Sequence, residues 1–300
     1  MNSNQLDQID DPDQLLEMGL KAGLRSDYST AIKCFERVID IQIVNHRIWF
    51  LLGLVYDHSG QIEKGVQCYL KALELKPDYP DALVNLGTDL ERIGDISTAI
   101  ACYRRAVALK PDFFEAWAIL GIVHCDIGEF QQAIDCSKKA LDIRSDCYVA
   151  LNTLGRVYHQ LDDLTTAFDY YIQALKIKPD YHEPYNFLGL IYVQREELGN
   201  AIDLLIKAIE LKPNYAEAYN NRGVVHAMRG ELDEAIFCFL KALEYKSNYY
   251  EAMYNLSSAY YESNQMDKAK EYLKKAEQLE DKELEKETIE EKIFDQNNFI

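Results

Sequence analysis

Apolar and small residues recur along the chain at a fixed interval of 34 residues. The segment Leu73–Tyr79 returns in closely similar form at Val107–Phe113, and again at Leu175–Tyr181 and Ile209–Tyr215. Self-similarity at a fixed period of this length is typical of repeat architectures. Stepping by 34 residues gives eight repeats, and the nth residue of a repeat is its nth place. Their boundaries are 12–45, 46–79, 80–113, 114–147, 148–181, 182–215, 216–249 and 250–283.

Two places in each repeat hold a small residue. The eighth place is Gly in every repeat except the last, which has Ser257, and the twentieth is Ala in every repeat except the second, which has Gly65. Two antiparallel helices approach closely only where a small residue lets a ridge of one enter the groove of the other. Each repeat is therefore expected to form a pair of helices that pack together at these places.

The ends of the expected helices also carry signals. Proline has no N–H to donate and clashes with the preceding helical turn, so it ends a helix. Prolines that would end second helices are Pro77, Pro111, Pro179 and Pro213. Residues that could cap the next first helix occupy the thirty-third place, which directly follows the place of these prolines. They are Asp78, Asp112, Asp180, Asn214 and Asn248.

The second repeat resembles the tetratricopeptide repeat pattern almost place for place. It has Trp49, Leu52, Gly53 and Tyr56 in its first half and Tyr69, Ala72 and Pro77 in its second. The resemblance implies an all-α fold, an α-solenoid of antiparallel helix pairs stacked into a right-handed superhelix. The chain is similar to the repeat arrays of the O-linked sugar transferases, but without their catalytic domain.

The two ends of the chain depart from this pattern. Residues 1–11 are acidic and are expected to be disordered. After residue 283, Leu284–Phe294 has apolar residues among many charges and is expected to form a partial capping helix, with a loose tail at 295–300. Residues 284–300 are thus predicted to be a charged capping helix and tail.

Charge and composition narrow the class of partner. A formal net charge of −18 argues against nucleic acid, because phosphate binding needs a surplus of Lys and Arg. No window approaches the roughly 20 apolar residues that span a bilayer, and no secretory signal is visible, so membrane insertion is not expected. The odd number of cysteines, 7, without a CxxC pair favours reduced thiols and a cytoplasmic protein.

No cofactor, metal or catalytic site is expected. Cys125, Cys136 and Cys147 with His124 lack the close spacing of a zinc site. The chain has neither a phosphate-binding loop nor a nucleophile with a paired base, so we predict that it is not an enzyme.

The resemblance implies that the first helix of each repeat lines an inner groove, at places two, five, six, nine, twelve and thirteen. Acids at the second place could make a negative stripe that attracts a basic partner, or could simply stabilise the helix dipole. The acids chosen as candidates are Asp81, Glu115, Glu183, Glu217 and Glu251.

Asparagines occupy the fifth and sixth places of several repeats. Asparagine offers both donor and acceptor, so a row of them can pair with the backbone of an extended peptide, or can bond only to neighbouring repeats. The candidates are Asn85, Asn152, Asn186, Asn220, Asn221 and Asn255. Of these, Asn85, Asn221 and Asn255 match the asparagine ladder of peptide-binding family members. Arg156 could anchor a ligand carboxylate or pair with nearby acids.

The predicted function is therefore a protein interaction scaffold that binds a peptide or helix of a partner protein in its groove. One alternative is a targeting or regulatory subunit of a separately encoded enzyme such as a glycosyltransferase. The other is an assembly factor that self-associates through its end repeats, so the chain is expected to be a monomer or weakly associating.

Overall fold

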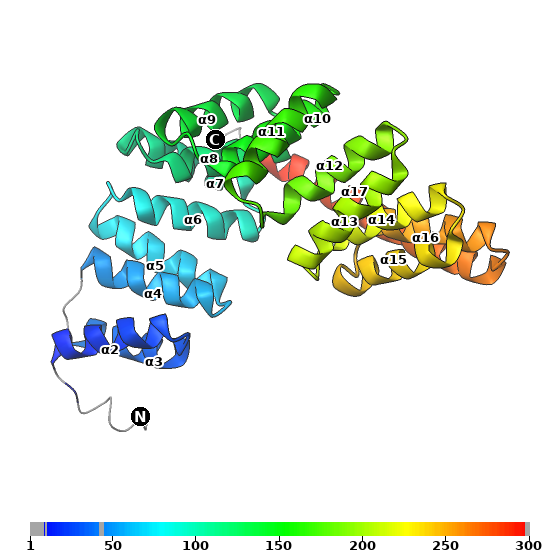
Figure 1. Ribbon diagram of the computed structural model, residues 1–300. Coiled ribbons are helices and arrows are strands. Elements are labelled where there is room, and N and C mark those ends of the chain that lie inside the picture. Colours follow the sequence, from blue (N-terminus) through cyan, green and yellow to red (C-terminus); the bar gives the residue numbers. More distant parts are fainter. Residues whose placement is uncertain (1–8, 10, 42–44, 298–300) are drawn as a thin grey trace. The chain divides into compact units, whose positions relative to one another are not determined.

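The computed structural model describes residues 9, 11–41 and 45–297, and for 283–297 the backbone alone. Over these residues it contains 16 α-helices and no β-strand (Figure 1). The first helices of the repeats are α2 (Pro12–Leu24), α4 (His46–His58), α6 (Pro80–Arg92), α8 (Phe114–Asp126), α10 (Tyr148–Gln160), α12 (His182–Gln194), α14 (Ala216–Met228) and α16 (Tyr250–Glu262). The second helices are α3 (Tyr28–Asp40), α5 (Ile62–Leu75), α7 (Ile96–Leu109), α9 (Phe130–Ile143), α11 (Leu164–Ile177), α13 (Leu198–Leu211), α15 (Leu232–Tyr245) and α17 (Met266–Asn297).

Every first helix begins at the residue where the 34-residue step places it. The two helices of a repeat are joined by a short turn, and the second helix then packs against the first helix of the next repeat, as α3 does against α4 and α13 against α14. The predicted all-α solenoid of antiparallel helix pairs is confirmed. The chain divides into two compact units, an N-terminal unit of residues 1–153 and a C-terminal unit of residues 154–300, and the boundary falls within α10.

In five repeats the glycine at the eighth place of the first helix lies against an aromatic ring of the second helix, whereas Gly189 meets Leu205 and Gly121 meets Ser137. A Cβ added at Gly53 would lie 2.6 Å from the ring of Tyr69, and one at Gly223 would lie 2.6 Å from the ring of Phe239. Real Cβ atoms do not approach other atoms so closely, so any larger residue would push the helices apart. The small residues at this place are therefore required by the ring opposite, and the rings of Tyr69, Tyr103, Tyr171, Phe35 and Phe239 are the largest buried side chains.

The caps of the first helices differ from the expectation. Before α6, α8, α12, α14 and α16 the preceding residue is the aromatic of the thirty-fourth place, such as Tyr79 or Tyr215, and it makes no side-chain capping bond. Asp78 precedes that aromatic and so lies one residue too early to cap α6. Side-chain caps occur at α2 and α4, from Asp11 and Asn45, and at second helices such as α7, where Asp95 accepts from the backbone N–H of Thr98.

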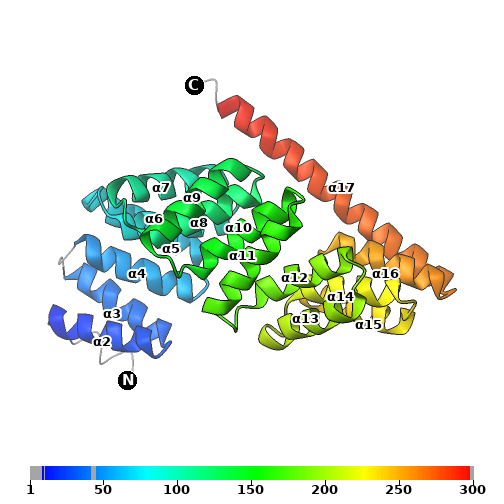
Figure 2. The same cartoon turned by 45° about the horizontal axis from the view of Figure 1, so that its top comes forward.

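The described residues include only part of each chain end. Most of residues 1–11 lie outside the described residues. Of the others, Ile9 packs against the hydrophobic cluster that contains Leu15 and Phe35, and Asp11 caps α2. At the other end α17 runs unbroken from Met266 to Asn297, so the backbone of residues 284–297 continues the second helix of the last repeat (Figure 2). The reason is the absence of Pro and Gly from this segment: Glu280 and Asp281 stand where earlier repeats have Lys and Pro. Of the expected loose tail, residues 298–300 lie outside the described residues.

The exception at Gly65 has a structural cause in the next repeat. The tenth place of the first helix is a buried apolar residue in most repeats, such as Val123, but it is Asp89 in the third repeat. Asp89 is only 1% exposed, and a Cβ added at Gly65 would lie 2.7 Å from its Oδ2. The missing methyl group of Gly65 therefore makes room for a carboxylate in the core between α5 and α6.

This buried carboxylate has two charged neighbours. Arg92 bonds to Asp57 and lies 3.5 Å from Oδ1 of Asp89. Burial and the carboxylate of Asp57 together raise the pKa of Asp89 to about 6, against the opposing effect of Arg92. Ionised Asp89 is thus a cost to the folded N-terminal unit at neutral pH.

We predict that the N-terminal unit becomes more stable as the pH falls from about 8 to about 5. The folded-state pKa of Asp89 lies above its usual value of 3.8, so the stabilisation is complete at low pH and is lost as pH rises through about 6. Asp89→Asn should remove this dependence and raise the free energy of unfolding at pH 8 by on the order of 2 kcal/mol. Urea unfolding across pH measures both effects, with Asp142→Asn, an exposed acid, as control. Parallel pH profiles for wild type and Asp89→Asn would contradict the assignment.

The pairing of Gly65 with Asp89 predicts strong coupling between the two positions. Gly65→Ala alone should destabilise the fold by about 1–3 kcal/mol, because its methyl group meets Asp89. In an Asp89→Val background the same change should be stabilising by about 0.5–1 kcal/mol, because Ala is the better helix former. A double-mutant cycle by urea unfolding tests this, and additive effects would refute it.

Candidate functional site

All twelve candidate residues lie on first helices, but in two separate units. The N-terminal unit holds Asp81 and Asn85 on α6, Glu115 on α8 and Asn152 on α10. The C-terminal unit holds the other eight, on α10, α12, α14 and α16: Arg156, Glu183, Asn186, Glu217, Asn220, Asn221, Glu251 and Asn255.

Four asparagines of the C-terminal unit form two pairs that join neighbouring repeats. Nδ2 of Asn221 on α14 donates to Oδ1 of Asn186 on α12, at 2.9 Å. Nδ2 of Asn255 on α16 donates in the same way to Oδ1 of Asn220 on α14, also at 2.9 Å. We call Asn186, Asn220, Asn221 and Asn255 the asparagine surface.

The two members of each pair differ in exposure. Asn186 and Asn220 are only 3% and 6% exposed, whereas Asn221 and Asn255 are half-buried. A buried amide must find partners within the protein, and the half-buried amide of the next repeat supplies one. The inner asparagine of each pair thus holds the outer one, and the outer one is what a ligand would meet.

Tyrosines of the thirty-fourth place lie beside this surface. Tyr249 is 9% exposed, and burial together with the carboxylates of Glu217 and Glu251 raises the pKa of its hydroxyl to about 12. A hydrogen bond with Asn220 acts in the opposite direction. Burial likewise raises the pKa of Tyr215, which lies near Glu183, Glu217 and Arg156. Both phenols therefore stay neutral at physiological pH.

The acids of this unit are partly engaged within the protein. Glu183 accepts a bond from the hydroxyl of Tyr181 at 3.1 Å, and Glu217 lies 3.6 Å from Nζ of Lys246. Glu251 is exposed at the start of α16. The acids therefore flank the asparagine surface, although Lys246 offsets part of their charge.

The candidates of the N-terminal unit have unlike environments. Asn85 donates from Nδ2 to the carbonyl of Asp81 in its own helix, at 2.8 Å, and Asp81 itself is exposed. Glu115 is exposed at a cavity between α8 and α10, whereas Asn152 is 2% exposed. The two acids of the second place are thus both exposed, whereas Asn85 at a sixth place and Asn152 at a fifth place differ in burial.

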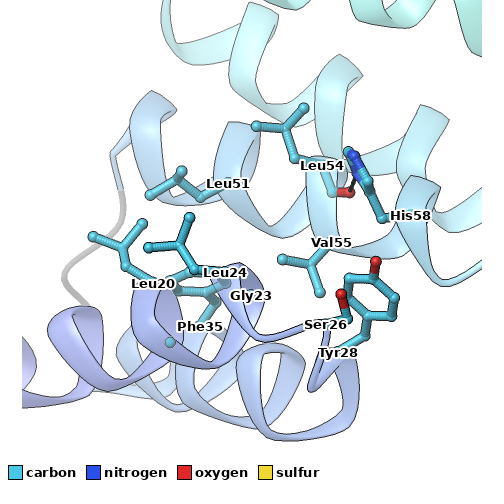
Figure 3. Close-up of a pocket in the computed structure, with 11 residues that line it drawn as sticks. Leu20, Gly23, Leu24, Ser26, Tyr28, Phe35, Leu51, Leu54, Val55 and His58 are labelled. Atoms are coloured by element: carbon cyan, nitrogen blue, oxygen red, sulfur yellow. Dashed lines mark hydrogen bonds between the residues drawn. The ribbon is translucent and has the colours of Figure 1, made fainter.

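An apolar cavity in the first two repeats was missed by sequence reasoning. It has a volume of about 440 Å³ and lies between α2 and α4 (Figure 3). Leu24, which is 89% exposed, lies at its edge with Leu20, Leu51 and Leu54. These four occupy sixth, ninth and thirteenth places, so the signal was available: they are apolar where groove places elsewhere are often polar.

Metal sites and membrane-spanning helices were also sought among the residues that the structure describes. No group of three or more His, Cys, Asp and Glu side chains is placed to hold a metal ion there. Within the same residues, no helix combines the length and the apolar character needed to cross a membrane. All seven cysteines are buried and unpaired by disulfides, and burial raises the pKa of Cys68 to about 12.

Comparison with known protein families agrees with the helix pairs. Models described as tetratricopeptide repeat match residues 46–79, 80–113, 112–180, 216–249 and 250–289, and one described as TPR repeat matches 189–230. The chain belongs to the tetratricopeptide repeat family. Tetratricopeptide repeat proteins bind protein or peptide partners, so membership supports a role in protein interaction.

Among curated proteins, the chain is similar to peroxisomal targeting signal receptors of yeasts. It is 33% identical to the receptor of Saccharomyces cerevisiae over 84 residues, which are 28% of this chain and 14% of the receptor. It is 31% identical to the receptor of Candida albicans over 77 residues, which are 26% of this chain and 13% of the receptor. The chain thus matches only a small part of the length of these relatives.

Solved structures share the fold. A tetratricopeptide repeat protein from Parabacteroides merdae has a TM-score of 0.71 at 16% identity, covering 83% of this chain and 98% of that one. The Cut9–Hcn1 hetero-tetramer of APC/C has a TM-score of 0.66 at 18% identity, covering 85% of this chain and 58% of that one. These identities are low, so the likeness concerns the fold alone.

The asparagine pairs predict a measurable loss of stability when an outer member is removed. Asn221→Ala leaves Oδ1 of the buried Asn186 without its donor, which should lower the free energy of unfolding by about 1–2 kcal/mol. Asn85→Ala is the matched control, because its bond stays within its own helix, and it should change stability by less than about 0.5 kcal/mol. Chemical unfolding of both variants decides the matter. Equal effects would mean that the pair contributes nothing to the packing of α12 on α14.

Proposed function

We propose that the chain is an interaction protein without catalytic activity of its own, and that it binds an extended peptide segment of a partner at the asparagine surface. The observation that carries the proposal is the pairing of Asn221 with Asn186 and of Asn255 with Asn220. Each pair fixes the orientation of an amide that also faces outward.

The pairing leaves useful chemistry on the outer asparagines. An asparagine amide has two N–H donors and a carbonyl oxygen with two lone pairs, and the bond to the inner asparagine uses one donor. The remaining groups can bond to the N–H and C=O of a peptide backbone. Because the inner asparagine already holds the side chain in place, binding costs less rotamer entropy than it would for a free surface amide.

The flanking charges favour a ligand with basic residues. Glu183, Glu217 and Glu251 lie on the same three helices as the asparagines, and the chain as a whole has a net charge of −18. Opposite charge on the ligand raises the association rate and is screened by salt. Affinity for a basic peptide should therefore fall as salt rises.

The class of protein to which the curated relatives belong supports this proposal. The yeast proteins that share 31% to 33% identity with part of this chain are receptors for a targeting signal. A receptor recognises a segment of another protein, and we infer the same class of ligand here. Whether the segment recognised by this chain is itself a targeting signal is a separate matter, since the match covers 14% of the Saccharomyces cerevisiae receptor.

The proposal predicts that peptides selected on the full-length chain depend on the outer asparagines. Linear peptides are selected from a random displayed library, and their affinity for the wild type and for Asn221→Ala combined with Asn255→Ala is measured by calorimetry. We expect at least a tenfold loss, corresponding to about 1.4 kcal/mol. Raising salt from about 50 mM to about 300 mM should weaken peptides that carry Lys or Arg more than neutral ones.

Asn85→Ala serves as the matched control, and it should bind the peptides as the wild type does. Circular dichroism at the assay temperature establishes that the double variant is folded. Unchanged affinity in a folded double variant would show that the asparagines serve only to join repeats.

A further inference from the structure

The thirty-fourth place is aromatic in five of the six interior repeats, the second to the seventh, and only the fourth of these six lacks the ring. Tyr79, Phe113, Tyr181, Tyr215 and Tyr249 occupy this place in five repeats, whereas the fourth repeat, within the N-terminal unit, has Cys147. The side chain of Cys147 is buried, with 5% exposure, but it is much smaller than a ring. The side chain at the thirty-fourth place of the fourth repeat therefore has a smaller volume than the aromatic side chain of the other five repeats.

Two equivalent hydrophobic clusters show the difference directly. One contains Ala242, Ala252 and Tyr249, and the other contains Ala140, Ala150 and Cys147 at the same three places of their repeats. In the second cluster Phe114 is added from the first place of its repeat, where the first cluster has Ala216. Phe114 fills part of the missing volume from the other side.

A cavity remains in spite of Phe114. It has a volume of about 360 Å³ and lies between α8 and α10. Its lining includes Phe114, Ala118, Ile119, Cys147 and Val149, with Arg144 at the edge. This volume lies within the range of sites that hold small ligands, and the lining is mainly apolar.

The charges around the cavity indicate what kind of side chain fits it. In four other repeats a lysine lies over the aromatic ring of the thirty-fourth place, with Nζ 4.2–5.0 Å from the ring centroid. In the fourth repeat the equivalent residue is Arg144, and its guanidinium lies 4.2 Å from the centroid of Phe114 instead. A cation held next to the cavity is complementary to the negative face of an aromatic ring.

Arg144 and Asp146 disfavour a ligand that binds through a carboxylate. Nε of Arg144 lies 3.6 Å from a carboxylate oxygen of Asp146, so its charge is already partly balanced and is a weak anchor for a ligand carboxylate. The ring of Phe114 leaves room for an aromatic guest, because other repeats place two rings side by side at the same places. His46 and His182 occupy the first place, as Phe114 does. They pack edge-on against Tyr79 and Tyr215, with 5.2 Å and 4.8 Å between ring centroids.

We propose that this cavity binds one aromatic side chain of a partner protein, in the place that Tyr or Phe of this chain fills in other repeats. The guest ring would lie against Phe114 and Ala118, with Arg144 over its face. The cavity lies wholly in the N-terminal unit, so this binding site is independent of the asparagine surface in the C-terminal unit.

The experiment uses the full-length chain and three small probes, N-acetyl-tyrosine amide, N-acetyl-leucine amide and N-acetyl-alanine amide. Ligand-observed NMR titration should show weak binding of the tyrosine probe, with a Kd of about 1–10 mM, and at least tenfold weaker binding of the other two. Cys147→Tyr fills the cavity from within and restores the usual ring. It should abolish binding of the tyrosine probe while raising the unfolding midpoint.

Cys147→Ser is the matched control, since it keeps the cavity open and should retain the tyrosine probe. If Cys147→Tyr does not fold, Ala118→Leu narrows the same cavity from α8 and should also weaken binding at least tenfold. The proposal is overturned if the wild type does not prefer the tyrosine probe, or if a folded variant with a filled cavity binds it unchanged. None of these outcomes depends on Asn221 or Asn255, so the two proposals can fail separately.

Discussion

In five of the eight repeats the close approach of the two helices depends on one contact, between a glycine of the first helix and an aromatic ring of the second. At Gly87 the missing Cβ would lie 2.6 Å from the ring of Tyr103, and at Gly155 it would lie 2.5 Å from that of Tyr171. The ring fills the space that the glycine leaves, so neither residue can change alone. Because this contact sets the distance between helices, it also sets how closely the next repeat can pack.

Departures from the repeat pattern are informative because the pattern is so strict. Gly65 replaces alanine, and the space is used by the carboxylate of Asp89. Cys147 replaces an aromatic residue, and part of the space stays open as a cavity. The first exchange makes stability depend on pH, since a buried carboxylate costs free energy when it ionises. The second leaves an apolar surface that the chain itself does not cover.

Periodicity predicted the fold, and local chemistry decided the details that it could not predict. The 34-residue step placed the start of every first helix, including α4 and α10, which follow Asn45 and Cys147 rather than an aromatic residue. The capping role of Asp78 was wrong, since a shift of one residue removes a cap. The roles of Asn85 and Asn221 could not be separated, because both are sixth-place residues and only the neighbour across the repeat distinguishes them: Asn221 meets Asn186, whereas Asn85 bonds to Asp81.

Joining repeats and binding a ligand are compatible tasks for the asparagine surface. A buried amide such as Asn186, at 3% exposure, needs a partner, and the donor from Asn221 meets that need without using the rest of the Asn221 amide. An isolated surface asparagine would lose more rotamer freedom when it binds a peptide backbone. The same bond that joins α14 to α12 would therefore hold the outer amide in place for the peptide that we propose as ligand. It follows that loss of stability and loss of binding in Asn221→Ala would have a common physical origin, and that binding must be compared at a temperature where both proteins are fully folded.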